Sequence, residues 1–271
     1  MKNFLKFKNY FERIINENNQ KKLFERNQQA FSKTAMKSLE KLTEKKIERV
    51  FVVGNGPSIN NQNLNFLKNE FTICSNAFFL KYPEIDWRPT IFTIEDHLPA
   101  NDYASFFKSD SESLKIIPYD LKDTIGLNSS IVYINFLRTY GPSFLPFWPK
   151  FSNDFLKQAY WGGTVSYLSI QIASYFKPKK IYLIGTDLNY KEPHDLHKKG
   201  DVYTSRSQDV NHFHPDYFGI GKKWHNPKVN VMQKSFNAAK KYLSKSNISI
   251  INATNGGNLK GIERVNFEEI F

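Results

Sequence analysis

The chain has 271 residues, of which 40% are hydrophobic and 15% aromatic, and this composition excludes a largely disordered protein. A single cysteine, Cys74, excludes an internal disulfide and a thiolate zinc cluster, as is common in a reducing cytoplasm. The net charge is +12, but the sequence has no zinc-finger, helix-turn-helix or RNA-recognition signature, so we expect no nucleic-acid partner.

Residues 3–46 contain neither proline nor glycine, and they place apolar residues at helical spacing between lysines. We therefore expect residues 1–48 to form a basic, amphipathic helical extension ahead of a main domain that spans residues 49–271. The favoured interpretation is that these helices pack on the main domain or on a second subunit. The alternative is a peripheral contact with the inner face of the membrane by an otherwise cytoplasmic protein.

An apolar strand predicted at Val50–Val53 runs directly into Gly54-Asn55-Gly56-Pro57-Ser58. Glycines allow a ligand to approach the backbone closely, and a turn of this kind presents N–H groups to a phosphate. The dinucleotide fingerprint is not met, because Ile59 stands where its third glycine would be and no acidic residue follows at the ribose position. The sequence therefore predicts a phosphate loop, with an ordinary tight connection as the alternative.

Short β-rich runs recur along the rest of the chain, and helical patterns separate several of them. The clearest helices are predicted at Thr164–Phe176 and Val229–Ser246. This alternation predicts an α/β fold of Rossmann type, with a doubly wound, mostly parallel sheet in a three-layer sandwich. The predicted strands are Val50–Val53, Phe71–Cys74, Thr90–Ile94, Leu114–Ile117, Ile131–Ile134, Ile181–Ile184 and Ile248–Ile251.

Polar residues follow most of these strands, at the edge where such sheets bind their ligands. They include Ser75-Asn76, Glu95-Asp96-His97 and Gly185-Thr186-Asp187. A long insertion, residues 187–228, is rich in His, Asp, Tyr and Trp and predicts a packed lid over this edge.

With these residues placed, the chain resembles the bacterial sialyltransferases of glycosyltransferase family 42. It also resembles the related domain of motility-associated flagellin glycosyltransferases and of archaeal 6-hydroxymethylpterin diphosphokinases, the MptE-like domain. The resemblance covers roughly residues 49–255. It rests on Gly54-Asn55-Gly56-Pro57-Ser58, Cys74-Ser75-Asn76, Gly162-Gly163-Thr164, the strand ending in Gly185-Thr186-Asp187, and His225 ahead of a long helix.

The resemblance implies a role for each matching position. It implies that Gly54, Asn55, Gly56 and Ser58 hold the donor phosphate, that Asn76 contacts the cytidine nucleotide, and that Asp187 contacts the ribose or supports the structure. Gly162, Gly163 and Thr164 resemble a Thr-Ser-Gly turn that faces the nucleotide or the donor carboxylate, although two of its hydroxyl positions are glycine here. Tyr160 and Tyr167 are candidates for the tyrosines that assist phosphate departure.

His225 matches the histidine that the family uses as general base toward the acceptor hydroxyl. A neutral imidazole with a pKa near ~6.5 suits that task at physiological pH. The alternative is a surface histidine ahead of a helix. His212 and His214, together with Asp216, leave a divalent metal site open as a further alternative, and Asp96 is another candidate ligand.

The leading prediction is therefore a glycosyltransferase that moves a sialic-acid-like sugar from a CMP-activated donor to a glycan or protein acceptor and requires no cofactor. The first alternative is a diphosphokinase in which Glu95, Asp96 and Asp187 hold a magnesium–ATP complex. The second is a non-catalytic module that binds sugar nucleotides in surface polysaccharide synthesis. Under the leading prediction, Glu95 belongs to the donor-binding residues.

Overall fold

The computed structural model describes residues 32–110, 112–138, 140, 148–191 and 195–271, together with scattered residues between 8 and 25, all of them helical. Its centre is an eight-stranded sheet with the order β13-β12-β8-β1-β2-β3-β4-β5, in which every pairing is parallel. The strands are β1 (Arg49–Val53), β2 (Phe71–Ser75), β3 (Ile91–Thr93), β4 (Leu114–Pro118), β5 (Ile131–Ile134), β8 (Lys180–Ile184), β12 (Ser249–Asn252) and β13 (Glu263–Arg264). The predicted α/β fold of Rossmann type is confirmed.

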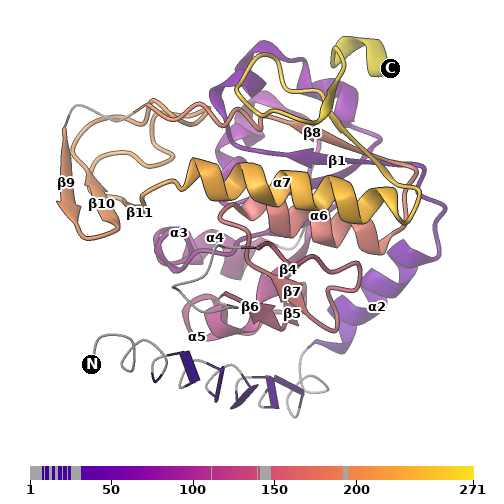
Figure 1. Cartoon of the computed structure of the whole chain (residues 1–271), viewed down its shortest axis with the longest axis horizontal. Helices are drawn as coiled ribbons and strands as arrows, with labels where there is room; N and C mark the ends of the chain where they lie inside the picture. Colours follow the sequence, from indigo (N-terminus) through magenta and orange to yellow (C-terminus); the bar gives the residue numbers. More distant parts are fainter. Residues whose placement is uncertain are drawn as a thin grey trace.

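Helical layers cover both faces of this sheet (Figure 1), because its strands are apolar on both sides. One face packs against α2 (Lys33–Thr43), α6 (Val165–Tyr175) and α7 (Val229–Ser244). The other packs against shorter helices: η2 (Pro57–Asn61), η3 (Leu64–Leu67), η4 (Phe78–Glu84), α3 (His97–Asp102), α4 (Ala104–Ser109), η5 (Tyr119–Leu121) and α5 (Lys122–Ile125). The turn η6 (Glu268–Ile270) ends the chain.

The residues before the main domain contribute to its core. Helix α2 buries Ala35 and Leu39 in the cluster under β4 and β5. Further upstream, Phe24 is buried edge-to-face on Tyr119, with ring centroids 5.5 Å apart. Packing on the main domain is therefore seen at these positions, whereas the domain boundary itself stays a prediction. Across the described residues, no helix combines the length and apolarity needed to cross a bilayer.

The winding of the sheet reverses between β1 and β8. From β1 the chain builds outward through β2, β3, β4 and β5, and it then returns to place β8 on the other side of β1. Ligands of open α/β sheets bind at such a reversal, outside the carboxyl ends of the strands. The loops that follow β1 and β8 therefore meet at the expected binding position.

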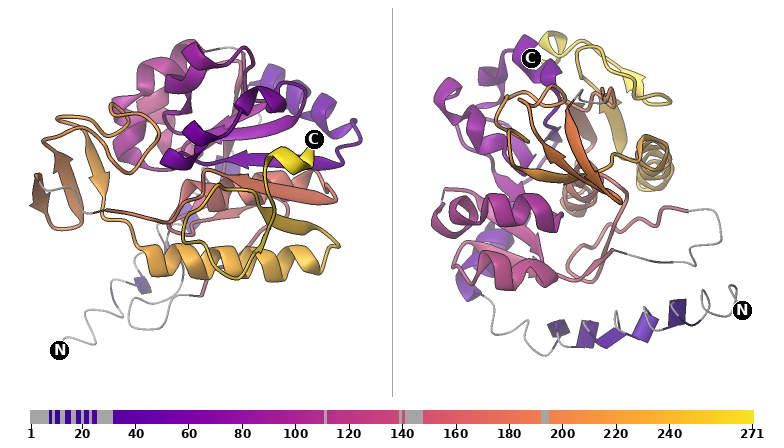
Figure 2. Two further views of the ribbon diagram at one scale, coloured as in Figure 1. Left: turned by 90° about the horizontal axis from the view of Figure 1, so that it is seen from above. Right: turned by 90° about the vertical axis from the view of Figure 1, so that its left-hand side faces the viewer.

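The insertion after β8 carries a small antiparallel sheet of its own. Its strands β9 (Leu196–Lys199), β10 (Val202–Ser205) and β11 (Lys223–His225) stand at the end of the molecule where α7 begins (Figure 1), and the right-hand view of Figure 2 looks onto this end. Because the helix that follows a parallel strand runs back along the sheet, α7 begins near the carboxyl edge. A further parallel pair, β6 (Phe136–Leu137) and β7 (Ala159–Tyr160), lies outside the main sheet.

Candidate functional site

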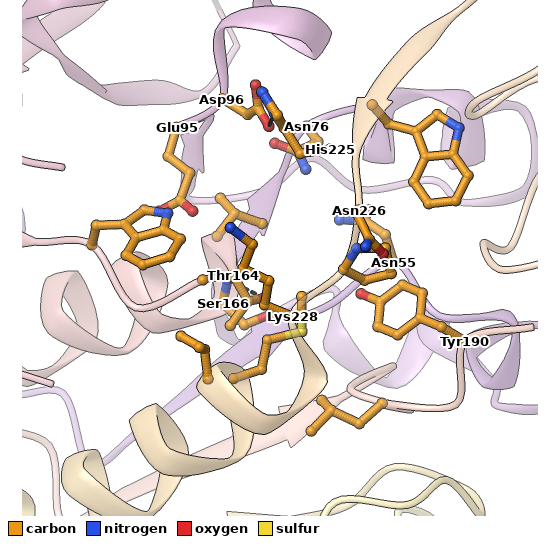
Figure 3. Close-up of a pocket in the computed structure, with 18 of the residues that line it drawn as sticks. Asn55, Asn76, Glu95, Asp96, Thr164, Ser166, Tyr190, His225, Asn226 and Lys228 are labelled. Carbon is orange, nitrogen blue, oxygen red and sulfur yellow. Dashed lines mark hydrogen bonds and ion pairs between the residues drawn. The ribbon is translucent and has the colours of Figure 1, made fainter. Parts of the chain in front are cut away.

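A cavity of about 980 Å³ opens at the carboxyl edge of the sheet. Its walls come from the loops after β1, β2, β3 and β8, from the beginning of α6 and from the insertion (Figure 3). Most of the residues predicted from the sequence line it: Asn55, Gly56, Asn76, Glu95, Asp96, Gly163, Thr164, Asp187, His212 and His225. Gly54, Ser58, Gly162 and His214 are not among the lining residues.

The loop after β1 is bound tightly to the loop after β8. The N–H groups of Gly54 and Gly56 donate to the carbonyl oxygens of Ile184 (2.7 Å) and Gly185 (2.9 Å). A Cβ atom on Gly54 would lie 2.4 Å from the Gly185 oxygen, so only glycine allows the two backbones to approach this closely. These two N–H groups are therefore engaged within the protein, and their predicted contact with a donor phosphate stays a prediction.

The carboxylate of Asp187 lies against the same loop. It accepts a hydrogen bond from the Ser58 hydroxyl at 2.8 Å, and a Cβ atom on Gly56 would lie 1.6 Å from its Oδ2. Burial raises the pKa of Asp187, and the hydrogen bond from Ser58 opposes that shift. An anionic group of the chain itself thus occupies the space beside Gly56.

Asn55 and Asn76 present neutral acceptors to the cavity. Their side-chain N–H groups donate to Ser75 Oγ (3.1 Å) and to the Tyr217 hydroxyl (3.0 Å), which fixes the orientation of each amide. Each Oδ1 atom is buried without a hydrogen-bond partner in the described part of the chain. These two oxygens are placed to accept hydrogen bonds from N–H or O–H groups, which a nucleoside carries on its base and ribose.

Helix α6 begins at the cavity wall. Thr164 is its N-cap, with Oγ1 accepting a hydrogen bond from the Ser166 N–H at 3.3 Å. The structure requires glycine at both positions before Thr164. A Cβ atom on Gly162 would lie 2.2 Å from the Tyr167 ring, and Gly163 has a φ of 81°. Packing and backbone geometry thus account for glycine at both positions.

His225 and Asp96 form a pair at the edge of the cavity. His225 ends β11, Asp96 follows β3, and His225 Nδ1 lies 2.7 Å from Asp96 Oδ2. The Asp96 hydrogen bond raises the pKa of His225 above its usual 6.5, against the opposing effect of burial. Burial works to raise the pKa of Asp96, but hydrogen bonds from His225 and from the Leu98 N–H outweigh it and lower that pKa. The sequence prediction gave Asp96 only a conditional metal role and missed this pairing.

The conditional metal ligands do not come together. Asp96 uses both oxygens, because Oδ1 accepts from the Leu98 N–H at 2.9 Å and caps α3. His212 Nδ1 lies 2.7 Å from Asp209, and His214 Nδ1 accepts from the Asp216 N–H at 3.1 Å. The described residues contain no group of three His, Cys, Asp or Glu side chains arranged for a metal.

The tyrosines that line the cavity are not the two predicted. Tyr167 is fully buried and donates its hydroxyl to the Lys150 carbonyl at 2.8 Å, while Tyr160 packs edge-to-face on Tyr140. Neither lines the cavity, whereas Tyr190 does. Burial raises the pKa of Tyr190 to about 12, so its hydroxyl stays protonated at neutral pH.

A family model described as "6-hydroxymethylpterin diphosphokinase MptE-like" matches residues 21–193, which is more than half of the chain. The chain belongs to the MptE-like family. The match includes the loops after β1, β2, β3 and β8 and the beginning of α6, but it ends before His225. None of the curated proteins matches this MptE-like chain.

Among solved structures, the MAf glycosyltransferase of Magnetospirillum magneticum AMB-1 is similar to this MptE-like chain, with a TM-score of 0.50 and 14% identity. The similarity covers 82% of this chain but 34% of the MAf protein, so this chain spans about a third of that protein's length. At this level of identity the likeness shows a shared fold. Together with the family match, it confirms the resemblance to the MptE-like domain of motility-associated glycosyltransferases.

Proposed function

We propose that this protein is a glycosyltransferase that moves a sugar from a nucleotide-activated donor to an acceptor hydroxyl. The observation that carries the proposal is the His225–Asp96 pair at the edge of a cavity that lies where the sheet reverses its winding. The fold shared with a protein described as a MAf glycosyltransferase supports it. The finer proposal, a sialic-acid-like sugar on a CMP donor, rests on the family resemblance of the loops.

In the proposed reaction, the acceptor oxygen attacks the anomeric carbon and forms the new glycosidic bond while the bond from that carbon to the phosphate oxygen breaks. With a proton on Nδ1 directed at Asp96, His225 has a free lone pair on Nε2, which takes the proton of the acceptor hydroxyl. Asp96 holds the ring and stabilises the imidazolium that forms. The nucleotide leaves with the electron pair of the broken bond.

Two features of the cavity wall support stabilisation of the departing phosphate. The beginning of α6 lines the cavity from Gly163 to Ser166, and helix N-termini favour anions. Lys150 and Lys228 line it as well. Asn55 and Asn76 provide the neutral acceptors for the nucleoside. A monophosphate such as CMP carries less charge than a diphosphate, so the helix N-terminus and the lysines can stabilise it without a metal cation.

A thermal-shift panel of CMP, UDP, GDP and ATP, each with and without magnesium, tests the proposal, because a ligand that binds the folded state raises the melting temperature. We expect CMP to give the largest shift, with no dependence on magnesium. A shift with magnesium–ATP and none with CMP would favour the diphosphokinase alternative, which the name of the family supports. Binding of a CMP-sugar with neither transfer nor hydrolysis would indicate a binding module.

A further inference from the structure

Glu95 lies in the wall of the cavity without a role in the reaction described above. It follows β3 by two positions and is only 5% exposed. Its Oε2 atom is shielded from solvent and has no hydrogen-bond partner within the described ranges, although the residue lines the cavity. Figure 3 shows the side chain extending from the end of β3 into the cavity, beside Asp96. Buried polar atoms are almost always paired, so an unpaired one at a cavity wall is placed to contact a ligand or a water molecule.

Burial favours the neutral form of Glu95. Burial raises the pKa of Glu95 to about 8, Arg138 opposes the shift, and the negative charges of Asp96 and Asp120 add to it. Arg138 is itself paired with Asp120, with its Nη2 atom 3.0 Å from Asp120 Oδ1, and Tyr140 is a further titratable neighbour of Glu95. A neutral carboxyl group carries an O–H that donates a hydrogen bond.

The position of Glu95 in the sheet separates it from the expected nucleotide subsite. The nucleotide is placed at the reversal between β1 and β8, and β3 lies two strands away from β1. With strands ~4.8 Å apart, the end of β3 lies ~10 Å from the end of β1. Glu95 is instead next in sequence to Asp96, which holds His225. It therefore faces the region where the transferred sugar and the acceptor meet.

We propose that Glu95 is a specificity-determining residue that donates a hydrogen bond from its neutral carboxyl group to an oxygen of the transferred sugar. The assignment of this region to the sugar rests on the proposed function. The ligand group is a hydrogen-bond-accepting oxygen, such as a carbonyl, carboxylate or ether oxygen. The nucleotide part of the donor does not contact Glu95.

Two substitutions separate this role from a structural one. Glu95→Gln keeps a neutral donor of similar shape, whereas Glu95→Met fills the same space without any polar atom. If Glu95 serves a ligand, Glu95→Met removes a buried carboxyl group whose Oε2 has no partner in the described part of the chain, so the melting temperature should stay unchanged or rise by about 2–4 °C. Asp209→Leu is the matched control, because Asp209 is a buried carboxylate with donors from Asn211, His212 and Phe218, and it should lower the melting temperature.

Binding of CMP and of CMP-N-acetylneuraminic acid is measured for each variant by calorimetry. We expect Glu95→Met to bind CMP within about twofold of the wild-type affinity. It should bind the CMP-sugar at least tenfold more weakly than the wild type does, because the substitution removes one hydrogen bond to a buried group. Glu95→Gln should keep most of the CMP-sugar affinity.

Three results overturn the inference: a melting temperature of Glu95→Met more than 4 °C below that of the wild type, an unchanged CMP-sugar affinity in Glu95→Met, or an equal loss of CMP affinity. Failure of the wild type to bind either probe would instead refute the proposed CMP donor. The melting temperature of Glu95→Met would then decide for or against a ligand-facing role by itself.

Discussion

Replacing Asp96 with asparagine isolates the proposed action of the His225–Asp96 pair. Asparagine keeps an oxygen that accepts from the Leu98 N–H, so the N-cap of α3 is preserved. The two paired side chains are 32% and 49% exposed, and a pair this accessible contributes at most ~1 kcal/mol to stability. Asp96→Asn should therefore fold normally, and its effect should be seen in the reaction.

The expected effect on the rate follows from the work of a general base, which contributes ~10²–10⁴-fold. His225→Ala should lower turnover by ~10²-fold or more and leave CMP affinity nearly unchanged. Asp96→Asn should lower it by at least ~10-fold, because the imidazolium loses its carboxylate partner. Since the two residues act as one unit, the double variant should be no slower than His225→Ala alone.

The pH dependence gives a second, independent readout. The base must be neutral to accept a proton, and the Asp96 hydrogen bond raises the pKa of His225 above 6.5. The value of kcat/KM should therefore rise with pH through a pKa above 6.5 and then level off. In Asp96→Asn that rise should move to lower pH, with a lower plateau.

CMP release from a CMP-sugar in the presence of an acceptor is the assay for these variants. His97→Ala is the matched control, because His97 also lines the cavity, is also 49% exposed and also lies near an aspartate, Asp120, at 3.4 Å. A loss with His97→Ala as large as that with His225→Ala, or an Asp96→Asn profile identical to that of the wild type, would refute the assignment of His225 as the base.

Three further predictions concern stability and metal dependence. Lys115 is fully buried, and its Nζ lies 3.0 Å from Asp110 Oδ2. Lys115→Met should lower the free energy of unfolding in urea by ~3–5 kcal/mol, because it leaves a buried carboxylate unpaired. A loss below ~1 kcal/mol would contradict this. Gly56→Ala places a Cβ atom 1.6 Å from Asp187 Oδ2 and should destabilise the protein by ~2 kcal/mol or more in the same assay, whereas wild-type stability would show that Asp187 moves away at little cost. Activity should survive thorough EDTA treatment, and complete loss restored by magnesium or manganese would refute the metal-independent mechanism.

The sheet could be predicted from the sequence because its strands are buried on both faces and therefore read as continuous apolar runs. All seven predicted runs are strands of the main sheet, and α6 and α7 lie within the predicted helices. The missed strand β13 has only two residues, Glu263–Arg264, both exposed, so it has no apolar pattern to detect. Strand β9 of the insertion was missed for the same reason, since it reads Leu-His-Lys-Lys and is mostly exposed.

The loop after β1 shows why a motif predicts position better than chemistry. Its glycines do lie at the reversal of the sheet, but their nearest partners are the backbone after β8 and the carboxylate of Asp187. A Gly-rich turn is required both for a bound phosphate and for two backbones in close contact, and the residue types alone do not distinguish these uses. The two uses are distinguished only by the hydrogen-bond partner that each N–H group has in the structure.

The pairing of His225 with Asp96 had no local signal, because 129 positions separate the two residues and the small sheet of the insertion brings them together. Strand β11 is fixed by its antiparallel register with β10, in which His225 lies opposite Val202. The insertion is anchored to the main domain by separate contacts, among them the Phe213 N–H to the Asn55 carbonyl at 3.0 Å. The same insertion thus both walls the cavity and carries the proposed base. Substitutions that loosen β10 and β11 should consequently lower turnover without altering the proposed nucleotide subsite at the ends of β1 and β8.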